Sequence, residues 1–241
     1  MVQGRVHSIE TFGSLDGPGI RFIIFMQGCH MRCQYCHNPN TWNCAGGTLK
    51  SADELLTQAL RYKAYWGKQG GITVSGGEPL LQLDFLLDLF TKAKAKGIST
   101  CIDTAGQPFT RKEPFFNKFE QLVAVTDLLL LDMKHIDPEA HRKLTGQPND
   151  NILDLYRYLS DIHKPIWVRQ VLVPGLTDHE ESLKRTRAFL DTLTNVAKVE
   201  ILPYHTMGKY KYEKLGIPYP MKEVNPPSPE SVELAKHILG A

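Results

Sequence analysis

Short strand-like runs alternate with helical patterns along most of this chain, and the alternation limits its possible folds more than any other feature. Strands joined by helical crossovers form a mostly parallel sheet. The sequence therefore predicts an α/β fold, a single-domain partial (β/α)6 barrel with parallel strands. An open doubly wound sheet has the same periodicity and stays as the alternative. Expected strands span residues 20–27, 71–74, 99–102, 128–131, 165–173 and 199–202, and expected helices 51–65, 83–96, 113–123, 151–162, 180–193 and 229–239.

No internal repeat or low-complexity tract divides the chain, so we expect one domain over residues 1–241. The proline-rich stretch 225–229 is interpreted as a stiff connector before the last helix. Residues from about 206 to 241 follow the last expected strand and form a C-terminal extension. Tyrosines gather near the carboxyl terminus, at positions 204, 210, 212 and 219, either as packing or as a surface that faces a protein.

Composition excludes several classes of protein. Hydrophobic residues make up 42% of the 241 residues and charged residues 22%, which is typical of a globular chain and not of a disordered one. The formal net charge of +2 gives no electrostatic reason to expect nucleic acid or an anionic membrane as partner. No apolar stretch is long enough to cross a bilayer, and the amino terminus lacks the pattern of a signal peptide. We therefore expect a cytoplasmic location.

The cysteines point to a metal. Three of the five lie within eight residues, as Cys29-x3-Cys33-x2-Cys36, in a loop that spans residues 28–38. An odd total without a secretion signal argues against disulfides, and clustered thiolates select zinc or iron–sulfur clusters. A closed zinc site would need His30, His37 or Cys44 as a fourth ligand. Three thiolates on a [4Fe–4S] cluster would leave one iron open to bind and activate a molecule. Both readings stay open at this point.

Polar residues and glycines follow the expected strands at their carboxyl ends, where α/β folds place their active sites. Gly76 and Gly77 allow a ligand to approach the backbone closely, and Glu78 could accept from an amine. Asp103 and Asp132 could together hold a hard cation or an amine. Each of these features also has an ordinary explanation as a turn, a helix cap or a surface ion pair. Lys134 is a candidate partner for the carboxylates, and His205 for a ribose or adenine group.

At these residues the chain resembles a known family. The cysteine motif, with Tyr35 before its third cysteine, resembles the signature of the radical S-adenosylmethionine (SAM) enzymes. Further segments along nearly the whole chain look like those of the activating enzymes of pyruvate formate-lyase. They are Asp16-Gly-Pro-Gly-Ile-Arg21, Gln27-Gly-Cys29, Tyr35-Cys-His-Asn38, Ser75-Gly-Gly-Glu78, Asp132-Met-Lys134, Val173-Pro-Gly175 and Leu202-Pro-Tyr-His205.

The resemblance implies a role for each matching residue. Cys29, Cys33 and Cys36 would bind three irons of one [4Fe–4S] cluster, whose fourth iron SAM would chelate. A monovalent cation would lie at Asp103, Thr104 and Asp132, and Asp16 and Arg169 would face the glycine loop of the protein substrate. The residues implied in SAM binding are Tyr35, Cys36, His37, Gly76, Gly77, Glu78, Asp103, Asp132, Met133, Lys134 and His205.

The resemblance also implies an activity. A flavodoxin or a ferredoxin would reduce the cluster, and reductive cleavage of SAM would give a 5′-deoxyadenosyl radical. That radical would take a hydrogen atom from one glycine of pyruvate formate-lyase and leave a stable glycyl radical. The cysteine loop has no room for auxiliary clusters, and the enzyme is expected to act as a monomer. Cys44 and Cys101 receive no role and are expected to be ordinary thiols.

Three other functions stay open at this stage. The chain could activate another glycyl radical enzyme, or it could be a radical SAM enzyme that acts on a small molecule. It could also be a zinc-binding interaction protein without catalysis. Iron and sulfide content separates the last from the others.

Overall fold

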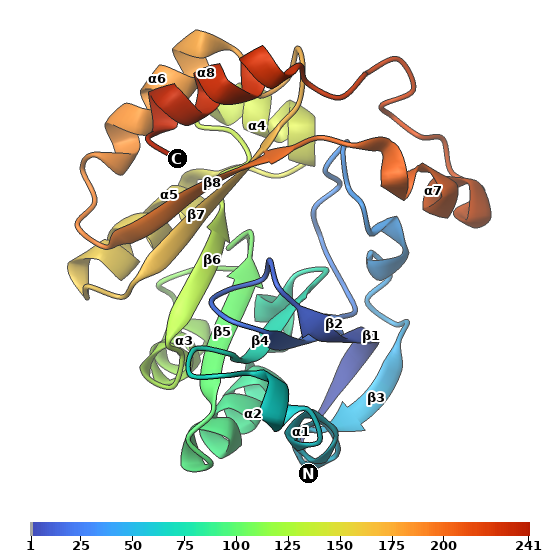
Figure 1. The fold of residues 1–241 in the computed structure, drawn as a ribbon, viewed down its shortest axis with the longest axis vertical. Helices are drawn as coiled ribbons and strands as arrows, with labels where there is room; N and C mark the ends of the chain where they lie inside the picture. Colours follow the sequence, from blue (N-terminus) through green and yellow to red (C-terminus); the bar gives the residue numbers. More distant parts are fainter. Residues whose placement is uncertain (1) are drawn as a thin grey trace. The chain divides into compact units, whose positions relative to one another are not determined.

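The computed structural model describes residues 2–241, which form two compact units (Figure 1). The first unit comprises residues 2–30 and 41–130, and the second comprises residues 31–40 and 131–241. Strands and helices alternate in both units. Strand β6 (Leu128–Asp132) carries the chain from the first unit to the second.

The first unit is built on a mixed sheet. Its strands follow the order β3-β1-β2-β4-β5, in which β2, β4 and β5 are parallel and β1 is antiparallel to both of its neighbours. Because β2, β4 and β5 run in the same direction, their carboxyl ends share one edge of the sheet. These strands are β1 (Gln3–Gly13), β2 (Arg21–Met26), β3 (Thr48–Ser51), β4 (Gly71–Gly76) and β5 (Ser99–Thr104).

Three helices accompany this sheet, with α2 packed between α1 and α3 (Figure 1). The capping box expected at the start of the first helix is present, since Ser51 Oγ accepts from Glu54 N and Glu54 Oε2 accepts from Ser51 N. That helix stops at Leu60 rather than at residue 65, and a short 3-10 turn over Lys63–Tyr65 replaces its predicted end. The helices are α1 (Ala52–Leu60), α2 (Leu83–Ala95) and α3 (Phe115–Ala124).

The second unit contains the parallel pair β7 and β8 and most of the remaining helices. Helices α6 and α8 pack against each other, as Figure 1 shows. Its elements are α4 (Pro138–Thr145), α5 (Asp150–Asp161), β7 (Ile166–Leu172), α6 (Glu180–Leu190), β8 (Val196–Pro203), the 3-10 turn Thr206–Gly208, α7 (Lys209–Leu215) and α8 (Pro229–Leu239).

Each of the six expected strands and six expected helices is present, with ends that differ by a few residues. Among the strands and α-helices of residues 2–241, four were not predicted: strands β1 and β3 and helices α4 and α7. Among the helices of residues 2–241, none combines the length and the apolar character that a bilayer crossing requires.

Candidate active site

The cysteine loop begins where β2 ends, and its first part belongs to the first unit. Gly28 has a φ of 103°, a conformation that favours glycine, and its N–H donates to Thr41 O at 2.7 Å. Its carbonyl accepts from Glu78 N at 2.8 Å. Cys29 follows directly and donates its N–H to Trp42 O at 3.4 Å. Backbone bonds to two other segments therefore hold this end of the loop.

The second part of the loop lies in the second unit and is pinned to helix α4. The N–H of Arg32 donates to Thr145 O at 2.7 Å, and that of Gln34 donates to Leu144 O at 3.0 Å. These two bonds lie on either side of Cys33, so the backbone of this cysteine has a fixed position. Helix α4, which the sequence did not reveal, is thus part of the support of the cysteine motif.

None of the five cysteines forms a disulfide. Cys33 is buried, and burial raises the pKa of its thiol to about 12, although the charge of Lys134 opposes the shift. The Cys36 sulfur accepts from Asn38 N at 3.4 Å. In the first unit, Cys101 is buried with its pKa raised to about 12, again mainly by burial, and Cys44 is exposed.

Gly76, which ends β4, and Gly77, which follows it, lie against the start of the cysteine loop. Gly76 has a φ of 115°, and a Cβ built there would fall 2.3 Å from Met26 N. A Cβ on Gly77 would fall 2.2 Å from Gly28 O and 3.3 Å from Cys29 Cβ. Any larger residue would push the backbones apart, so glycine is required at both positions for this close approach.

Glu78 is buried beside these glycines, and its carboxylate has several hydrogen-bond donors. It accepts from Thr104 Oγ1 at 2.5 Å, from Ala105 N at 3.0 Å and from Leu80 N at 3.0 Å. Thr104 and Ala105 lie at the end of β5 and Leu80 in the 3-10 turn Pro79–Gln82, and together they fix the orientation of the carboxylate. Hydrogen bonds of this kind stabilise the ionised form of a buried acid.

The residues proposed for a monovalent cation have other partners. Asp103 accepts from Ser75 Oγ at 2.6 Å, and the Thr104 hydroxyl donates to Glu78. In the second unit, Asp132 accepts from Lys134 Nζ at 2.8 Å. Lys134 is therefore the partner of Asp132 that the sequence suggested, while Asp103 uses a serine from the neighbouring strand.

Lys134 also lies beside the cysteine loop. Its Nζ is 5.6 Å from the centroid of the Tyr35 ring, and its charge acts on Cys33. Burial opposes the charged form of Lys134, but the Asp132 carboxylate holds its pKa well above the usual value. Met133, between these two residues, is buried and donates its N–H to Arg169 O at 2.8 Å. The Asp132-Met133-Lys134 segment thus contacts both the cysteine loop and β7.

His37 and His205 stack with ring centroids 4.0 Å apart, and His37 Nε2 lies 3.0 Å from His205 O. Burial lowers the pKa of His37, and the nearby His205 adds to this effect. His205 Nδ1 and the Tyr35 hydroxyl are buried and have no hydrogen-bond partner among the described residues. A buried polar atom without a partner is rare, and a bound ligand is one explanation for it.

Asp16 and Arg169, which were expected to face a protein substrate, lie in different units and have different partners. In the first unit, Asp16 O accepts from Thr73 Oγ1 at 2.6 Å. In the second unit, Arg169 Nε lies 3.8 Å from Glu200 Oε2, across the register pair that joins β7 to β8. The Asp16 loop is thereby tied to β4, and the Arg169 side chain is oriented by its partner strand.

A segment that the sequence did not single out for the site, residues 206–215, bonds to the cysteine loop. Tyr212 donates its hydroxyl to Cys36 O at 3.1 Å, and Lys211 Nζ donates to Asn38 Oδ1 at 2.6 Å. A Cβ on Gly208 would fall 3.0 Å from His37 Cα. Of the four tyrosines near the carboxyl terminus, Tyr204, Tyr212 and Tyr219 are buried and serve packing, whereas Tyr210 is exposed.

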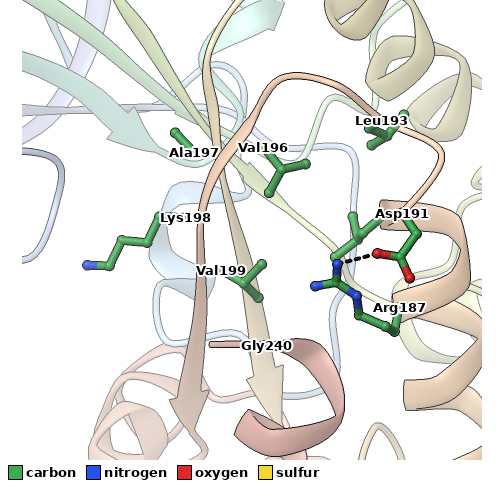
Figure 2. A pocket seen from close by; sticks show the side chains of 9 residues that line it. Arg187, Asp191, Leu193, Val196, Ala197, Lys198, Val199 and Gly240 are labelled. Atoms are coloured by element: carbon green, nitrogen blue, oxygen red, sulfur yellow. Dashed lines mark hydrogen bonds and ion pairs between the residues drawn. The ribbon is translucent and has the colours of Figure 1, made fainter.

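A separate cavity of about 260 Å³ in the second unit does not belong to this site (Figure 2). Residues 196–199 at the amino end of β8 line it, whereas His205 follows the carboxyl end of that strand. Arg187 spans it, paired with Asp191 and donating to Leu239 O at 2.9 Å. Ligands of parallel sheets bind at the carboxyl ends of the strands, so we regard this cavity as structural.

Within residues 2–241, no three His, Cys, Asp or Glu side chains converge on a point that could hold one metal ion. An iron–sulfur cluster makes a different demand, because each thiolate binds a different iron. Free thiols in a C-x3-C-x2-C loop, with backbones fixed beside Cys29 and around Cys33, are a donor set that fits such a cluster. In the second unit, the buried unpartnered atoms of Tyr35 and His205 fit a polar ligand such as a nucleoside.

Comparison with known proteins identifies the family. Residues 23–186 match the radical SAM superfamily. The chain is 55% identical over 240 residues to the pyruvate formate-lyase-activating enzyme of Streptococcus mutans, covering 99% of this chain and 91% of that one. It belongs to the pyruvate formate-lyase-activating enzymes of the radical SAM superfamily. The corresponding enzyme of Listeria monocytogenes is 53% identical, with 99% of this chain and 96% of that one covered.

Solved structures agree with this membership. A domain of a pyruvate formate-lyase-activating enzyme from Bacteroides vulgatus has a TM-score of 0.58 and 27% identity, covering 71% of this chain and 93% of that one. A radical SAM methyltransferase from Sphaerobacter thermophilus has a TM-score of 0.64 and 16% identity, covering 91% and 63%, and shares the fold. The predicted α/β fold of the radical SAM type is confirmed. Members of this superfamily are enzymes that use a [4Fe–4S] cluster and SAM.

Proposed function

We propose that this enzyme installs a glycyl radical on one glycine of pyruvate formate-lyase. The observation that carries the proposal is the 55% identity, over 99% of the chain, to an enzyme named for the activation of that protein. The cysteine loop of the structure supports it, because its free thiols fit the cluster of the family. When bound, cluster and SAM supply a one-electron reductive cleavage whose 5′-deoxyadenosyl radical takes a hydrogen atom from glycine.

We propose that Cys29, Cys33 and Cys36 hold the cluster. For SAM, we propose that the first unit contributes Gly76 and Gly77, the fixed carboxylate of Glu78, and Asp103. The second unit contributes unpartnered polar atoms of Tyr35 and His205, which a nucleoside would satisfy. The further residues proposed for SAM are Cys36, His37, Asp132, Met133 and Lys134.

We propose that the chain's own residues position the cofactors and shield them from water. Glu78 presents a carboxylate of fixed orientation to an amine, because backbone and hydroxyl donors hold it. The buried Tyr35, which lies near Cys33 and Cys36, excludes water around the thiols, which protects a reactive radical from side reactions. Lys134 forms an ion pair with Asp132. Its positive charge also acts on Cys33 and lowers the energetic cost of a thiolate there.

A monovalent cation at Asp103, Thr104 and Asp132 is part of the proposal. Its support is the chemistry of these oxygen donors, two carboxylates and a hydroxyl, which suit a hard cation. We also propose that Asp16 and Arg169 face the glycine loop of the protein substrate. The backbone bond that ties the Asp16 loop to β4 and the ion pair of Arg169 with Glu200 support a fixed position for each residue within its own unit.

For the partners, we propose flavodoxin or ferredoxin as electron donor and a monomeric enzyme that works in the cytoplasm as one radical SAM domain. Five free thiols suit a reducing compartment. The family match over residues 23–186 includes segments of both compact units, which supports one functional domain.

The test is anaerobic electron paramagnetic resonance (EPR). The reconstituted and reduced enzyme is mixed with SAM and purified pyruvate formate-lyase, and a glycyl radical doublet is expected only when all components are present. Formation of 5′-deoxyadenosine without the doublet would direct attention to another glycyl radical enzyme or a small molecule. Absence of both signals, from a sample with an intact reduced cluster, would contradict the proposed function.

Asp16→Ala is expected to lower the rate of glycyl radical formation about tenfold or more while SAM still binds with an unchanged Kd. A lost charge-assisted hydrogen bond to a substrate costs roughly 1.5–3 kcal/mol, and 1.4 kcal/mol corresponds to a factor of ten. The rate is followed by EPR and the Kd by calorimetry. Asp53→Ala, which removes an equal charge from an exposed site of the same unit, is the control. Unchanged activation by Asp16→Ala would exclude Asp16 from the site.

A further inference from the structure

Residues 206–215 expose an unusual combination of side chains, and we call this segment the α7 surface. Met207 is 70% exposed, Tyr210 52% and Leu215 46%. Large apolar side chains that are gathered on one exposed segment are typical of surfaces that bind a partner. Tyr and Met are also among the residues enriched in the cores of protein interfaces.

The α7 surface is also positively charged. It carries three lysines, Lys209, Lys211 and Lys214, and only one acidic residue, Glu213. Lys214 Nζ lies 5.3 Å and Lys211 Nζ 6.0 Å from the centroid of the Tyr210 ring. The exposed aromatic ring therefore has cations around it, an arrangement complementary to an acidic protein surface.

This surface is attached to the cysteine loop through its inner side. Tyr212, on the same helix, is almost completely buried, and its hydroxyl donates to the Cys36 carbonyl at 3.1 Å. Lys211 donates to Asn38 at 2.6 Å, and Gly208 packs closely on His37, since a Cβ on it would lie 3.0 Å from His37 Cα. A protein that docks on α7 is thus one buried residue away from a proposed cluster ligand.

We propose that the α7 surface is the docking site of an acidic one-electron carrier protein. The inference rests on the proposed function, in which the cluster must receive an electron before each SAM cleavage. In this transfer the reduced carrier loses one electron and the cluster gains it. No bond is formed or broken, and no proton is transferred. Two observations favour an electron carrier as the protein that docks here. The lysines are complementary to an acidic surface, and the bonds to residues 36–38 bring the docked protein close to the proposed cluster, which is all that electron transfer requires.

The double variant Lys209→Glu/Lys214→Glu tests the proposal in the reconstituted holoenzyme. Cluster reduction is followed by stopped-flow absorbance, once with reduced flavodoxin as an acidic carrier and once with a small neutral photoreduced deazaflavin. We expect reduction by flavodoxin to slow at least about tenfold at low salt, because charge complementarity governs association rates. The loss should shrink as salt screens the charges. Reduction by deazaflavin should be unchanged.

The matched control is Lys96→Glu/Lys112→Glu, which changes the net charge by the same amount at two exposed positions of the other unit. It should reduce normally with both donors. Met207→Gln/Leu215→Gln is a second test, since it should weaken flavodoxin binding without the salt dependence.

Three results would overturn the proposal. The first is an unchanged rate with flavodoxin in both test variants. The second is equal slowing with flavodoxin and deazaflavin, which would mean that α7 only supports the cysteine loop. The third is normal reduction with a raised KM for pyruvate formate-lyase, which would assign the surface to the protein substrate. Glycyl radical formation driven by deazaflavin tests the proposed function separately.

Discussion

A Cys33→Ala variant is expected to retain less than about a tenth of the iron that the parent enzyme binds, and to cleave no SAM. Three thiolates bind three different irons, so a lost thiolate leaves one iron without a protein ligand. The backbone of Arg32 and Gln34, on either side of Cys33, bonds to α4. The nearest other cysteine is Cys36, which is itself a proposed ligand. The loop therefore cannot shift a replacement sulfur into place. Iron and sulfide analysis after anaerobic reconstitution, with the visible absorbance, measures the loss.

Cys101→Ala and Cys44→Ser are the controls, since they remove one buried and one exposed thiol outside the motif. Both should bind iron like the parent. The Cys101 variant should lose about 1 kcal/mol of stability, because a small cavity replaces a buried sulfur. Full iron content in Cys33→Ala would refute its assignment as a ligand. Loss of metal in Cys44→Ser would instead favour a four-ligand zinc site.

The sequence predicted the α/β core because each of its strands is a short apolar run with a glycine or polar residue near its end. Strand β1 was missed for the opposite reason. Its residues alternate between buried and exposed without an apolar run, and it pairs antiparallel to β2. Helix α4 is short and polar, but its signals were present: Asp137 caps it, Pro138 occupies its first turn and Gly146 ends it in the left-handed conformation.

The candidate site could be found from the sequence as a set of residues but not as a set of contacts. Motif spacing located the cysteines and the Gly76-Gly77-Glu78 segment. The bond between Glu78 and Thr104 joins residues 26 positions apart, and that between Cys36 and Tyr212 joins residues 176 apart. Such pairs depend on tertiary packing, which local periodicity does not encode. Residues 206–215 were therefore expected as an extension whose tyrosines pack or face a protein, and not as a segment that holds one side of the cysteine loop.

Arg21→Met is expected to lower the free energy of unfolding by about 3–5 kcal/mol, the cost of removing one partner from a buried charged network. The Arg21 side chain is fully buried. Its guanidinium donates to Thr73 Oγ1 at 2.6 Å and to Ile72 O at 2.7 Å, and also to Pro18 O at 3.2 Å. Burial lowers the pKa of Arg21, with Cys101 opposing the shift, so the cation depends on these acceptors. Methionine would fill the space but leave them without donors.

The same variant should affect activation through the Asp16 loop. Thr73 Oγ1 accepts from Arg21 and donates to Asp16 O, and Pro18 O accepts from Arg21 directly. Arg21 is therefore a positioning residue for Asp16. We expect a raised KM for pyruvate formate-lyase with SAM binding unchanged. Arg21→Lys should lie between parent and Met variant, because it keeps the charge but not the planar array of donors.

Thermal unfolding of the holoenzyme under anaerobic conditions measures the stability. At roughly 2–4 °C per kcal/mol for a chain of this length, Arg21→Met should lower the Tm by about 10 °C. Arg61→Met, at the exposed end of α1, is the matched control and should change stability by less than about 0.5 kcal/mol. A Tm shift for Arg21→Met no larger than that of the control would mean that the acceptors find other donors. An unchanged KM alongside a large Tm shift would mean that Arg21 stabilises the first unit but does not position Asp16.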